Sequence, residues 1–561
     1  MMRLTAHTTP TTKRRRRTIL LPLYLSACLP LLASCLSEDP RGALEEGTAY
    51  TDATVLELGT VADIYNYIGG NSDSQGLQGT SRGVYDLNTF TTDEAMLPTR
   101  GGDWYDGGLW QGLYLHTWTP SEGILGDTWN YLYKVIMLCN LHLETLEANK
   151  HLLTESQLEA DKAELRSARA LFYFYTMDLF GRIPIVTNSS ASADKVKQSS
   201  RSEAFRFIID ELQTCVPLLS TDHSSMEGNY YRRITRPVVY FLLAKLLINA
   251  GIYADDDWTD NVVPDGKAMT FTVDGETMNA WDACIAYCDK LEALGYRLEE
   301  NFTDNFALHN ETSNENIFTI PMDKYLYANQ FQNLFRSRHY SHGSALGMDA
   351  WNGTSATIAT MKTFGYGTDE PDTRMDLSFY YGPLYVNGAP VLLEDGTQLV
   401  YEPMELRLDL SNSPYEKTAG ARMKKYETDQ TAYADGKLQS NDIVLFRYAD
   451  VLLMKGEALY RNGGDGSEYI NKVRKRVNMP PLVLTAEEAL DAATSPLLDE
   501  RLKELVWEGW RRNDLIRFHR FHTAYDQRPQ AAGEGNTFTT VFPIPGGVLD
   551  RNANLTQNPG Y

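Results

Sequence analysis

The apolar positions along the chain follow mainly the period of amphipathic helices. In the stretch 158–181 they share one helical face and recur every seven residues, at Leu158, Leu165, Phe172 and Leu179. Gly181 and the nearby Pro184 are typical of a helix end. A second amphipathic stretch, 129–147, precedes this one across a short polar segment, which predicts two antiparallel helices packed together.

Further helices are predicted at about 202–219, 236–253, 281–294, 443–461, 467–477 and 497–520. In the stretch 443–461, Gly456 lies on the apolar stripe, where its small size allows a neighbouring helix to approach closely. Paired helices of this length are similar to tetratricopeptide units, although no repeat of fixed period is present. Residues 295–440 differ, because Gly, Asn, Asp and Tyr are frequent there and long helical patterns are few. This part is predicted to consist of loops and short strands carried by the helical scaffold.

The first 34 residues are predicted to be a lipoprotein signal peptide. A basic segment, 13–17, precedes the apolar run 19–33, which prolines interrupt and which is too short to be a convincing membrane span. Cys28 and Cys35 both follow small residues, as the acylated cysteine of a bacterial lipobox does. The chain stays apolar after Cys28 and turns polar directly after Cys35, so Cys35 is the predicted lipidation site. A soluble secreted protein is the alternative.

The charge balance is acidic and argues against one class of partner. The whole chain has a net charge of −22, and residues 1–34 contain six basic and no acidic residues, so the mature chain has −28. Such a surface repels phosphate backbones, and nucleic acid is therefore not expected as a partner.

The remaining cysteines predict no metal centre. Cys139, Cys215, Cys284 and Cys288 form no C-x-x-C pair. The last two lie one turn apart on a predicted helix, where buried free thiols are favoured over a disulfide.

The sequence contains no recognisable catalytic motif. It has no G-x-S-x-G, no H-E-x-x-H and no phosphate-binding glycine loop. The acidic segment 255–265 could bind calcium, but its spacing fits no standard calcium loop, so a solvated loop is favoured and no cofactor is expected.

The charge-dense stretch 497–520 is predicted to be a structural ion-pair network. It places three glutamates at successive helical turns, Glu500, Glu504 and Glu508. Four arginines of the same stretch are available to pair with them, Arg501, Arg511, Arg512 and Arg517. Carboxylates that are committed to arginines are poor general acids, so a catalytic role is not expected.

The segment PTRGGDWYDGG, residues 98–108, combines aromatic and polar side chains on a glycine-rich loop. Asp103, Trp104, Tyr105 and Asp106 lie between pairs of glycines, and Arg100 is close by. Flat aromatic rings can cover the apolar C–H faces of a sugar, while Asp and Arg bond its hydroxyl groups. The alternative is that Trp104 and Tyr105 fold inward and fasten the loop to the helices.

Several longer segments point to a family. In order, the chain carries AELRSARALFYFYTMDLFGRIPIV, ENIFTIPM, DIVLFRYADVLLMKGEALYRNG, YINKVRKRVNMP, DERLKELVWEGWRRNDLIRF and VFPIPGGVLDRNANLTQNPGY. This series resembles the SusD/RagB family of outer-membrane nutrient-binding lipoproteins of Bacteroidetes, and the resemblance covers nearly the whole mature chain.

The resemblance implies a mostly α-helical fold of tetratricopeptide-like helix pairs with a loop-rich insertion region and short strands. The expected organisation is one SusD-like domain over 35–561, with the scaffold at about 50–294 and 441–561 and the ligand-face region at about 295–440. The family is not catalytic, and its members are lipid-anchored at the cell surface. The implied partner is a SusC-like TonB-dependent outer-membrane transporter, over which the lipoprotein acts as a lid.

The resemblance also implies where a ligand binds. In starch-binding members an arc of aromatic side chains stacks on sugar rings, and part of it lies where residues 98–108 stand here. The family's most variable stretch matches 323–354 and adds three aromatic candidates. The expected glycan-binding residues are Arg100, Asp103, Trp104, Tyr105, Asp106, Tyr325, Tyr327 and Trp351. Two alternatives remain, namely an oligopeptide-binding relative of the RagB branch and a surface glycoside hydrolase.

Overall fold

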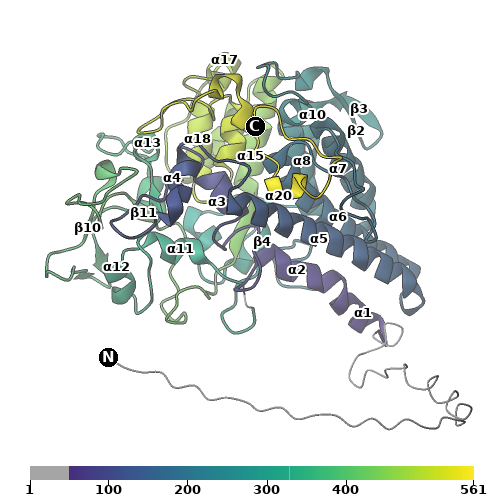
Figure 1. Ribbon diagram of the computed structural model, residues 1–561, viewed down its shortest axis with the longest axis horizontal. Coiled ribbons are helices and arrows are strands. Elements are labelled where there is room, and N and C mark those ends of the chain that lie inside the picture. Colours follow the sequence, from purple (N-terminus) through teal and green to yellow (C-terminus); the bar gives the residue numbers. More distant parts are fainter. Residues whose placement is uncertain (1–49, 328) are drawn as a thin grey trace, which may run out of the picture. The chain divides into compact units, whose positions relative to one another are not determined.

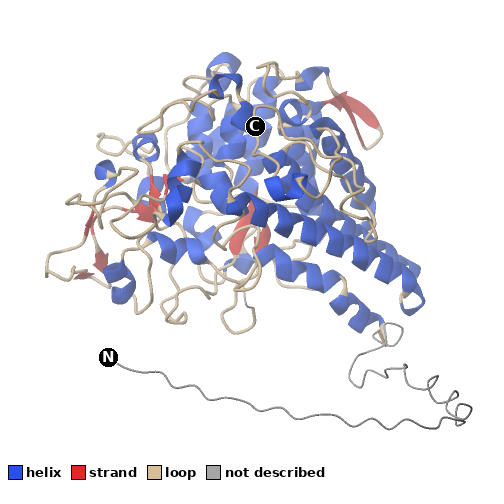
Figure 2. Cartoon of the chain, viewed as in Figure 1, coloured by secondary structure: helices blue, strands red, loops and turns tan. Residues whose placement is uncertain are grey.

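The computed structural model describes residues 50–327 and 329–561, so the predicted signal peptide (1–34) and Cys35 lie outside the described residues. Residues Asp52–Tyr561 form one compact unit. Helices dominate this unit, and the strands are few and short (Figure 1, Figure 2). The mostly α-helical fold predicted from the sequence is confirmed.

The first half of the unit is a series of packed helices, α5 (Gly123–Ala148), α6 (Glu155–Phe180), α7 (Arg201–Cys215), α8 (Arg236–Ile248) and α10 (Ala280–Ala293). The chain packs α5 on α6, α6 on α7 and α8 on α10. Helix α6 begins with a capping box between Thr154 and Gln157. It ends at Gly181, whose φ of 66° is a conformation that glycine adopts without strain. Helix α8 is buried on all sides, which explains its continuous apolar sequence.

The second helical group contains α15 (Tyr448–Arg461), α16 (Ser467–Arg476), α17 (Ala486–Leu490), α18 (Pro496–Leu505) and α19 (Arg511–Arg517). Helix α15 packs on α16 at Gly456, where a side chain would meet the Gly466 carbonyl oxygen at 3.0 Å. The close approach predicted at Gly456 is therefore present.

Two predicted helix boundaries are wrong. Residues 443–447 do not begin a helix but form strand β12 (Ile443–Arg447), which pairs antiparallel with β4 (Asn316–Ile320). Both strands are buried, and the apolar run 443–446 suits a strand with two covered faces. The stretch 497–520 is two helices, because the chain turns sharply between them at Trp507 (φ 69°) and Gly509 (φ 74°).

The loop-rich part carries short helices and paired strands. Its helices are α11 (Gln332–Ser337), α12 (Tyr340–Ala345), α13 (Ile358–Thr363) and α14 (Arg374–Ser378). Its antiparallel pairs are β1 (Ala95–Met96) with β5 (Ser355–Ala356), β6 (Phe379–Tyr380) with β11 (Arg422–Met423), β7 (Gly382–Pro383) with β10 (Val400–Tyr401), and β8 (Tyr385–Val386) with β9 (Ala389–Pro390).

The remaining α-helices are α1 (Ala53–Gly59), α2 (Val61–Gly69), α3 (Val84–Thr89), α4 (Leu109–Tyr114), α9 (Ala250–Tyr253) and α20 (Gly546–Leu549), and the remaining strands form the hairpin of β2 (Thr270–Val273) and β3 (Glu276–Asn279). Within 50–327 and 329–561, no helix has both the length and the apolar character needed to cross a membrane. The four cysteines in these ranges are buried and free, as favoured for Cys284 and Cys288.

Candidate functional site

The glycine-rich loop is a tight, irregular turn that leads into α4. The backbone N–H groups of Arg100 and Asp103 each donate to the other residue's carbonyl oxygen, at 2.9 and 3.0 Å. Gly101, Gly107 and Gly108 have positive φ, and so does Trp104, at 62°. A positive φ is strained for a residue with a large side chain, so the surrounding contacts must hold Trp104 in place.

The indole of Trp104 is half-buried and fixed from three sides. Its Nε1–H donates to the backbone oxygen of Trp351 at 3.0 Å, and the two ring centroids lie 6.2 Å apart. The ring of Trp110 packs edge-on at 6.3 Å. Behind the indole lies Gly353, where an added Cβ would come within 2.7 Å of Trp104. The loop and the variable stretch, far apart in the sequence, therefore meet at two tryptophans.

Trp351 is also half-buried and rests on α11. Its ring meets that of Phe335 edge-on at 4.6 Å, and its backbone N–H donates to the Phe335 oxygen. The ammonium of Lys437 lies 5.5 Å from the Trp351 ring centroid, a cation–π geometry. The Trp351 ring is thus held between an apolar floor and a cation.

Two tyrosines stand beside the tryptophans and face solvent. Tyr105 is 59% exposed and Tyr340 is 41% exposed. The Tyr340 hydroxyl donates to Oδ2 of Asp103 at 2.7 Å. Partial burial, together with the hydrogen bond to Asp103 and its charge, raises the pKa of Tyr340 to about 12. Tyr340 thus remains a neutral hydroxyl at neutral pH.

A second group of exposed tyrosines belongs to the same part of the molecule. Tyr325 is 76% exposed and packs edge-on against Tyr433 at 6.4 Å, while the guanidinium of Arg232 lies 5.4 Å from the ring centroid of Tyr327. The segment 433–437 connects this group to Trp351, because it contains both Tyr433 and Lys437. Together the two groups make up the aromatic face: Trp104, Tyr105, Tyr325, Tyr327, Tyr340, Trp351 and Tyr433.

The polar candidates of the loop have different placements. Asp103 is exposed on the face beside Tyr340. Asp106 accepts from Nε1–H of Trp110 at 2.6 Å and pairs with Arg82 at 3.0 Å, so it is engaged within the loop. Arg100 lies below the surface, where its guanidinium donates to the oxygens of Glu416, Ser355 and Ala419. Arg100 therefore supports the loop from beneath and presents no donor to the face.

Three arginines beneath the face lack a carboxylate partner among the described residues. Arg100 and Arg422 donate mainly to backbone oxygens, and Arg338 donates to the Thr428 hydroxyl at 2.6 Å. Burial lowers the pKa of Arg422 to about 10 and also lowers that of Arg338.

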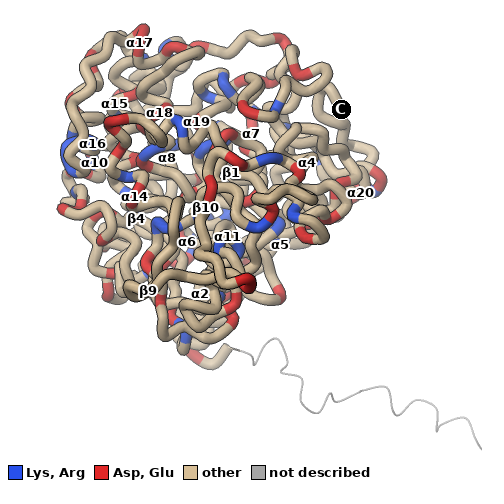
Figure 3. Tube along the Cα trace, turned by 90° about the vertical axis from the view of Figure 1, so that its left-hand side faces the viewer, with Lys and Arg blue, Asp and Glu red and all other residues tan. Residues whose placement is uncertain are grey.

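Along the described chain as a whole, acidic and basic positions are interspersed (Figure 3).

The glutamates of the predicted ion-pair network are buried and paired. Glu500 binds Arg374 and Arg474, Glu504 binds Arg374, Arg447 and Arg476, and Glu508 binds Arg447 and Lys425. The prediction that these glutamates pair with arginines of the same stretch is wrong. Those arginines bind other carboxylates: Arg501 binds Asp450, Arg511 binds Asp93, Arg512 binds Asp178 and Arg517 binds Glu457. The break at Trp507–Gly509 directs Arg511, Arg512 and Arg517 elsewhere, whereas Arg501 lies on α18 before the break and pairs with Asp450. Arginines on several sides hold the pKa of Glu504 far below its ordinary value despite burial.

Two family models match this chain. The model described as "SusD family" matches residues 295–561, and the model described as "Starch-binding associating with outer membrane" matches residues 77–248. The chain belongs to the SusD/RagB family.

A curated relative of this SusD-family protein is the starch-binding protein SusD of Bacteroides thetaiotaomicron. The two are 24% identical over 524 residues, which cover 88% of this chain and 87% of the relative. A SusD superfamily protein from Bacteroides vulgatus has a similar fold, with a TM-score of 0.66, 20% identity, and coverage of 92% of this chain and 100% of its own.

A surface glycan-binding protein A from Bacteroides thetaiotaomicron, solved in complex with laminarihexaose, has a similar fold as well. Its TM-score is 0.66 at 17% identity, covering 91% of this chain and 100% of that one.

Tyr340 and Tyr433 of this SusD-family protein were missed by sequence reasoning. Tyr340 lies within the variable stretch 323–354, so a search of that stretch for every aromatic residue would have found it. Tyr433 lies in a separate loop, where no local pattern marks it, and only the folded chain places it beside Tyr325.

Proposed function

We propose that this protein is a cell-surface lipoprotein that binds an oligosaccharide on the aromatic face without chemical conversion and delivers it to a SusC-like TonB-dependent transporter. Trp104, Trp351 and Tyr325 would stack on sugar rings, with Tyr105 and Tyr327 beside them. Asp103 would accept hydrogen bonds from sugar hydroxyls. Asp106 would act through the loop that it fastens.

The juxtaposition of Trp104 and Trp351 is the observation that carries this proposal. Two large half-exposed rings at 6.2 Å, that of Trp104 fixed by a hydrogen bond and that of Trp351 by packing, lose little conformational freedom when a ligand covers them. Their faces can bury the apolar side of a pyranose, and the neighbouring Asp103 and Tyr340 supply an acceptor and a hydroxyl for its rim. The names of the starch-binding relative and of the laminarihexaose complex support a glycan ligand.

Calorimetric titration with maltoheptaose and laminarihexaose tests this site. Loss of one stacked ring should lower the affinity about tenfold or more, since ~1.4 kcal/mol corresponds to a factor of ten. Trp104→Ala combined with Trp351→Ala should therefore abolish measurable binding. Val483→Ala, at an exposed position on a loop before α17, is the control and should bind as the wild type does. Unchanged affinity in the double variant would remove the site assignment.

Gly353→Ala offers a sharper test, because it leaves both indoles in the chain. The new methyl group would overlap the ring of Trp104 and push it from its position beside Trp351. Affinity should fall about tenfold, whereas unaltered binding would mean that the placement of this ring is not used.

A peptide ligand and a hydrolytic activity are the rival outcomes. Binding of a peptide library together with no binding on a glycan array would favour the RagB-like alternative. Release of free sugar during incubation with either oligosaccharide would contradict the proposal that the protein is not an enzyme.

The lipid anchor and the transporter are tested in cells of the native species. Cys35→Ser should release the protein from the outer-membrane fraction, while Cys28→Ser should leave it there. Purification of the lipidated chain should bring down a TonB-dependent transporter encoded next to it, and isolation without such a protein would contradict the partnership.

A further inference from the structure

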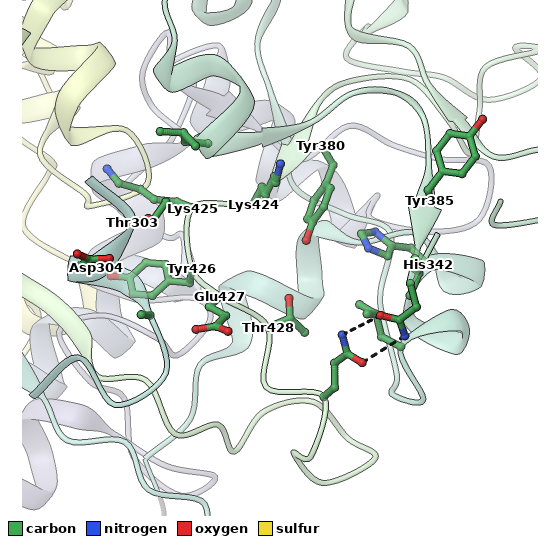
Figure 4. A pocket seen from close by; sticks show the side chains of 16 residues that line it. Thr303, Asp304, His342, Tyr380, Tyr385, Lys424, Lys425, Tyr426, Glu427 and Thr428 are labelled. Carbon is green, nitrogen blue, oxygen red and sulfur yellow. Dashed lines mark hydrogen bonds between the residues drawn. The ribbon is translucent and has the colours of Figure 1, made fainter. Parts of the chain in front are cut away.

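A separate cavity of about 580 Å³ opens in the loop-rich part, between α12, the β8–β9 hairpin and the segment 424–430 (Figure 4). Its volume is in the range of sites for small ligands. None of the aromatic-face residues line it. It is nevertheless close to that face along the chain, because α12 carries Tyr340 on the face and His342 in the cavity. The segment that includes Gln430 in the cavity wall continues to Tyr433 on the face.

His342 places a neutral hydrogen-bond donor in the cavity wall. The Tyr401 hydroxyl accepts the backbone N–H of His339 at 2.9 Å and lies 3.1 Å from Nδ1 of His342. Nδ1 is the one acceptor for the hydroxyl proton among the described residues, so we assign that proton to Nδ1 and the imidazole proton to Nε2. Nε2 has no hydrogen-bond partner among the described residues. Burial, reinforced by the nearby charge of Arg338, holds the pKa of His342 well below its ordinary value, so the ring is uncharged at neutral pH.

Two tyrosines give the cavity an aromatic wall and rim. The ring of Tyr380 stands edge-on to His342 at 4.7 Å, and its hydroxyl, which bonds to no other described residue, projects into the open space beside Thr428 (Figure 4). Tyr385 lies at the rim and is 58% exposed. The cavity thus offers a free hydroxyl and an exposed ring together.

The remaining wall contains both hydrogen-bond acceptors and donors. Asp304 and Glu427 contribute negative carboxylates, and Lys424 contributes a positive ammonium, so neither sign of charge dominates the wall. Asn387, at the tip of the β8–β9 hairpin, exchanges two hydrogen bonds with Gln430 at 3.4 and 3.5 Å. Bonds of this length are weak, and hydroxyl groups of a ligand could replace them without a large loss.

We infer that this cavity is a second saccharide subsite, which takes one neutral sugar residue of the same glycan that stacks on the aromatic face. A sugar hydroxyl both donates and accepts, and this wall presents a fixed neutral donor, amides, carboxylates and an unpartnered hydroxyl around exposed aromatic surface. The inference rests on the proposed function and makes a prediction of its own. Only a chain long enough to extend beyond the face gains affinity from the cavity.

Calorimetry with two chain-length series tests the subsite: maltose against maltoheptaose, and laminaribiose against laminarihexaose. The cavity variants are Tyr385→Ala and the double variant Tyr380→Phe with Gln430→Ala. Tyr385 and Gln430 are exposed, and Phe retains the Tyr380 ring, so all of them should fold as the wild type does. The affinity for the long oligosaccharide should fall about 5- to 10-fold, while the affinity for the disaccharide stays unchanged.

The face variant Trp104→Ala with Trp351→Ala should instead lower the affinity for both chain lengths. Unchanged affinity for the long oligosaccharide in the cavity variants, with a loss in the face variant, would overturn the subsite alone. Equal losses for both chain lengths in the cavity variants would also overturn it, because the cavity would then not be an extension. Failure of the wild type to bind any member of either series would overturn the proposed function and the subsite together.

Discussion

Buried arginines have two different environments in this molecule. In the C-terminal helical group they meet carboxylates, as Arg374 and Arg447 do at Glu504. Beneath the aromatic face, Arg100 and Arg422 donate to backbone oxygens and hydroxyls and have no carboxylate partner among the described residues. The arginines therefore have different structural roles in the two regions.

The paired arginines stabilise a junction of helices, because each charge is neutralised where several elements meet. The unpaired arginines organise irregular backbone, since a guanidinium has five N–H groups and can hold several carbonyls of one loop at once. Removing a carboxylate from the first region leaves buried cations with too few counter-charges. Removing an arginine from the second leaves carbonyls with fewer donors but removes the cost of a buried charge.

The largest effect is expected in the paired region, for Glu504→Ala. This change removes the carboxylate shared by Arg374, Arg447 and Arg476, which keep their other partners Asp372, Glu500, Glu315 and Glu508. Loss of one partner of a buried ion pair costs about 3–5 kcal/mol. Urea denaturation followed by tryptophan fluorescence measures the free energy of unfolding. Glu468→Ala, which breaks an exposed pair with Lys472, is the matched control and should cost less than about 0.5 kcal/mol. A loss below 1 kcal/mol for Glu504→Ala would show that this network is not stabilising.

A smaller effect is expected beneath the face, for Arg422→Met. The substitution removes donors from the carbonyls of Ser337, Gly353 and Thr354, which should cost about 1–3 kcal/mol. Because the same carbonyls position Gly353 behind Trp104, glycan affinity should also fall. If Arg422→Met were as unstable as Glu504→Ala, or less stable, in the same urea titration, the result would contradict the distinction between the two regions.

A third change tests Glu94, which lies between the regions and accepts the backbone N–H of Trp507 at 2.9 Å. Burial raises the pKa of Glu94 to about 8, so the folded protein prefers the protonated form. The folded-state pKa exceeds the unfolded value, and stability is therefore lost as the pH rises from about 4.5 to about 8. Glu94→Gln removes this loss. The free energy of unfolding of the variant, taken relative to that of the wild type, should therefore rise by about 1–2 kcal/mol as the pH increases from 5 to 8. Melting temperatures of both proteins across this pH range measure the effect, and a constant difference would disprove the assignment.

The long helices could be predicted from sequence because their signals are local. Thr154 and Gln157 at the start of α6 and Gly181 at its end mark the helix, and its apolar period supplies the rest. The turn at Trp507 and Gly509 was missed because the charged pattern continues through it. Contacts with residues far away in the sequence hold the chain there, among them Glu94 and Ser378. Strand 443–447 was missed because its apolar run of four residues, 443–446, fits a buried helix equally well.

In the candidate site, too, the sequence predicts local features, whereas long-range contacts are visible only in the fold. The sequence could propose Trp104 as a ligand residue, since an aromatic residue on a glycine-rich loop has little to pack against locally, and the family resemblance added Trp351. It could not show that they meet, because their contact spans 247 positions and depends on the left-handed backbone at Trp104. Arg100 shows the converse, since a polar residue next to such a loop can serve the loop instead of a ligand.

The smallest effect is expected at the rim of the face, for Arg82→Ala. The ion pair between Arg82 and Asp106 is solvent-exposed, with side-chain exposures of 54% and 33%, so water and salt screen it. Asp106 also keeps its hydrogen bond from Trp110, which fixes the carboxylate without the arginine. Stability should change by less than about 0.5 kcal/mol, and maltoheptaose or laminarihexaose affinity by less than twofold. A larger loss of affinity with unchanged stability would mean that Arg82 contacts the glycan directly, and the face would then extend beyond its aromatic residues to this cation.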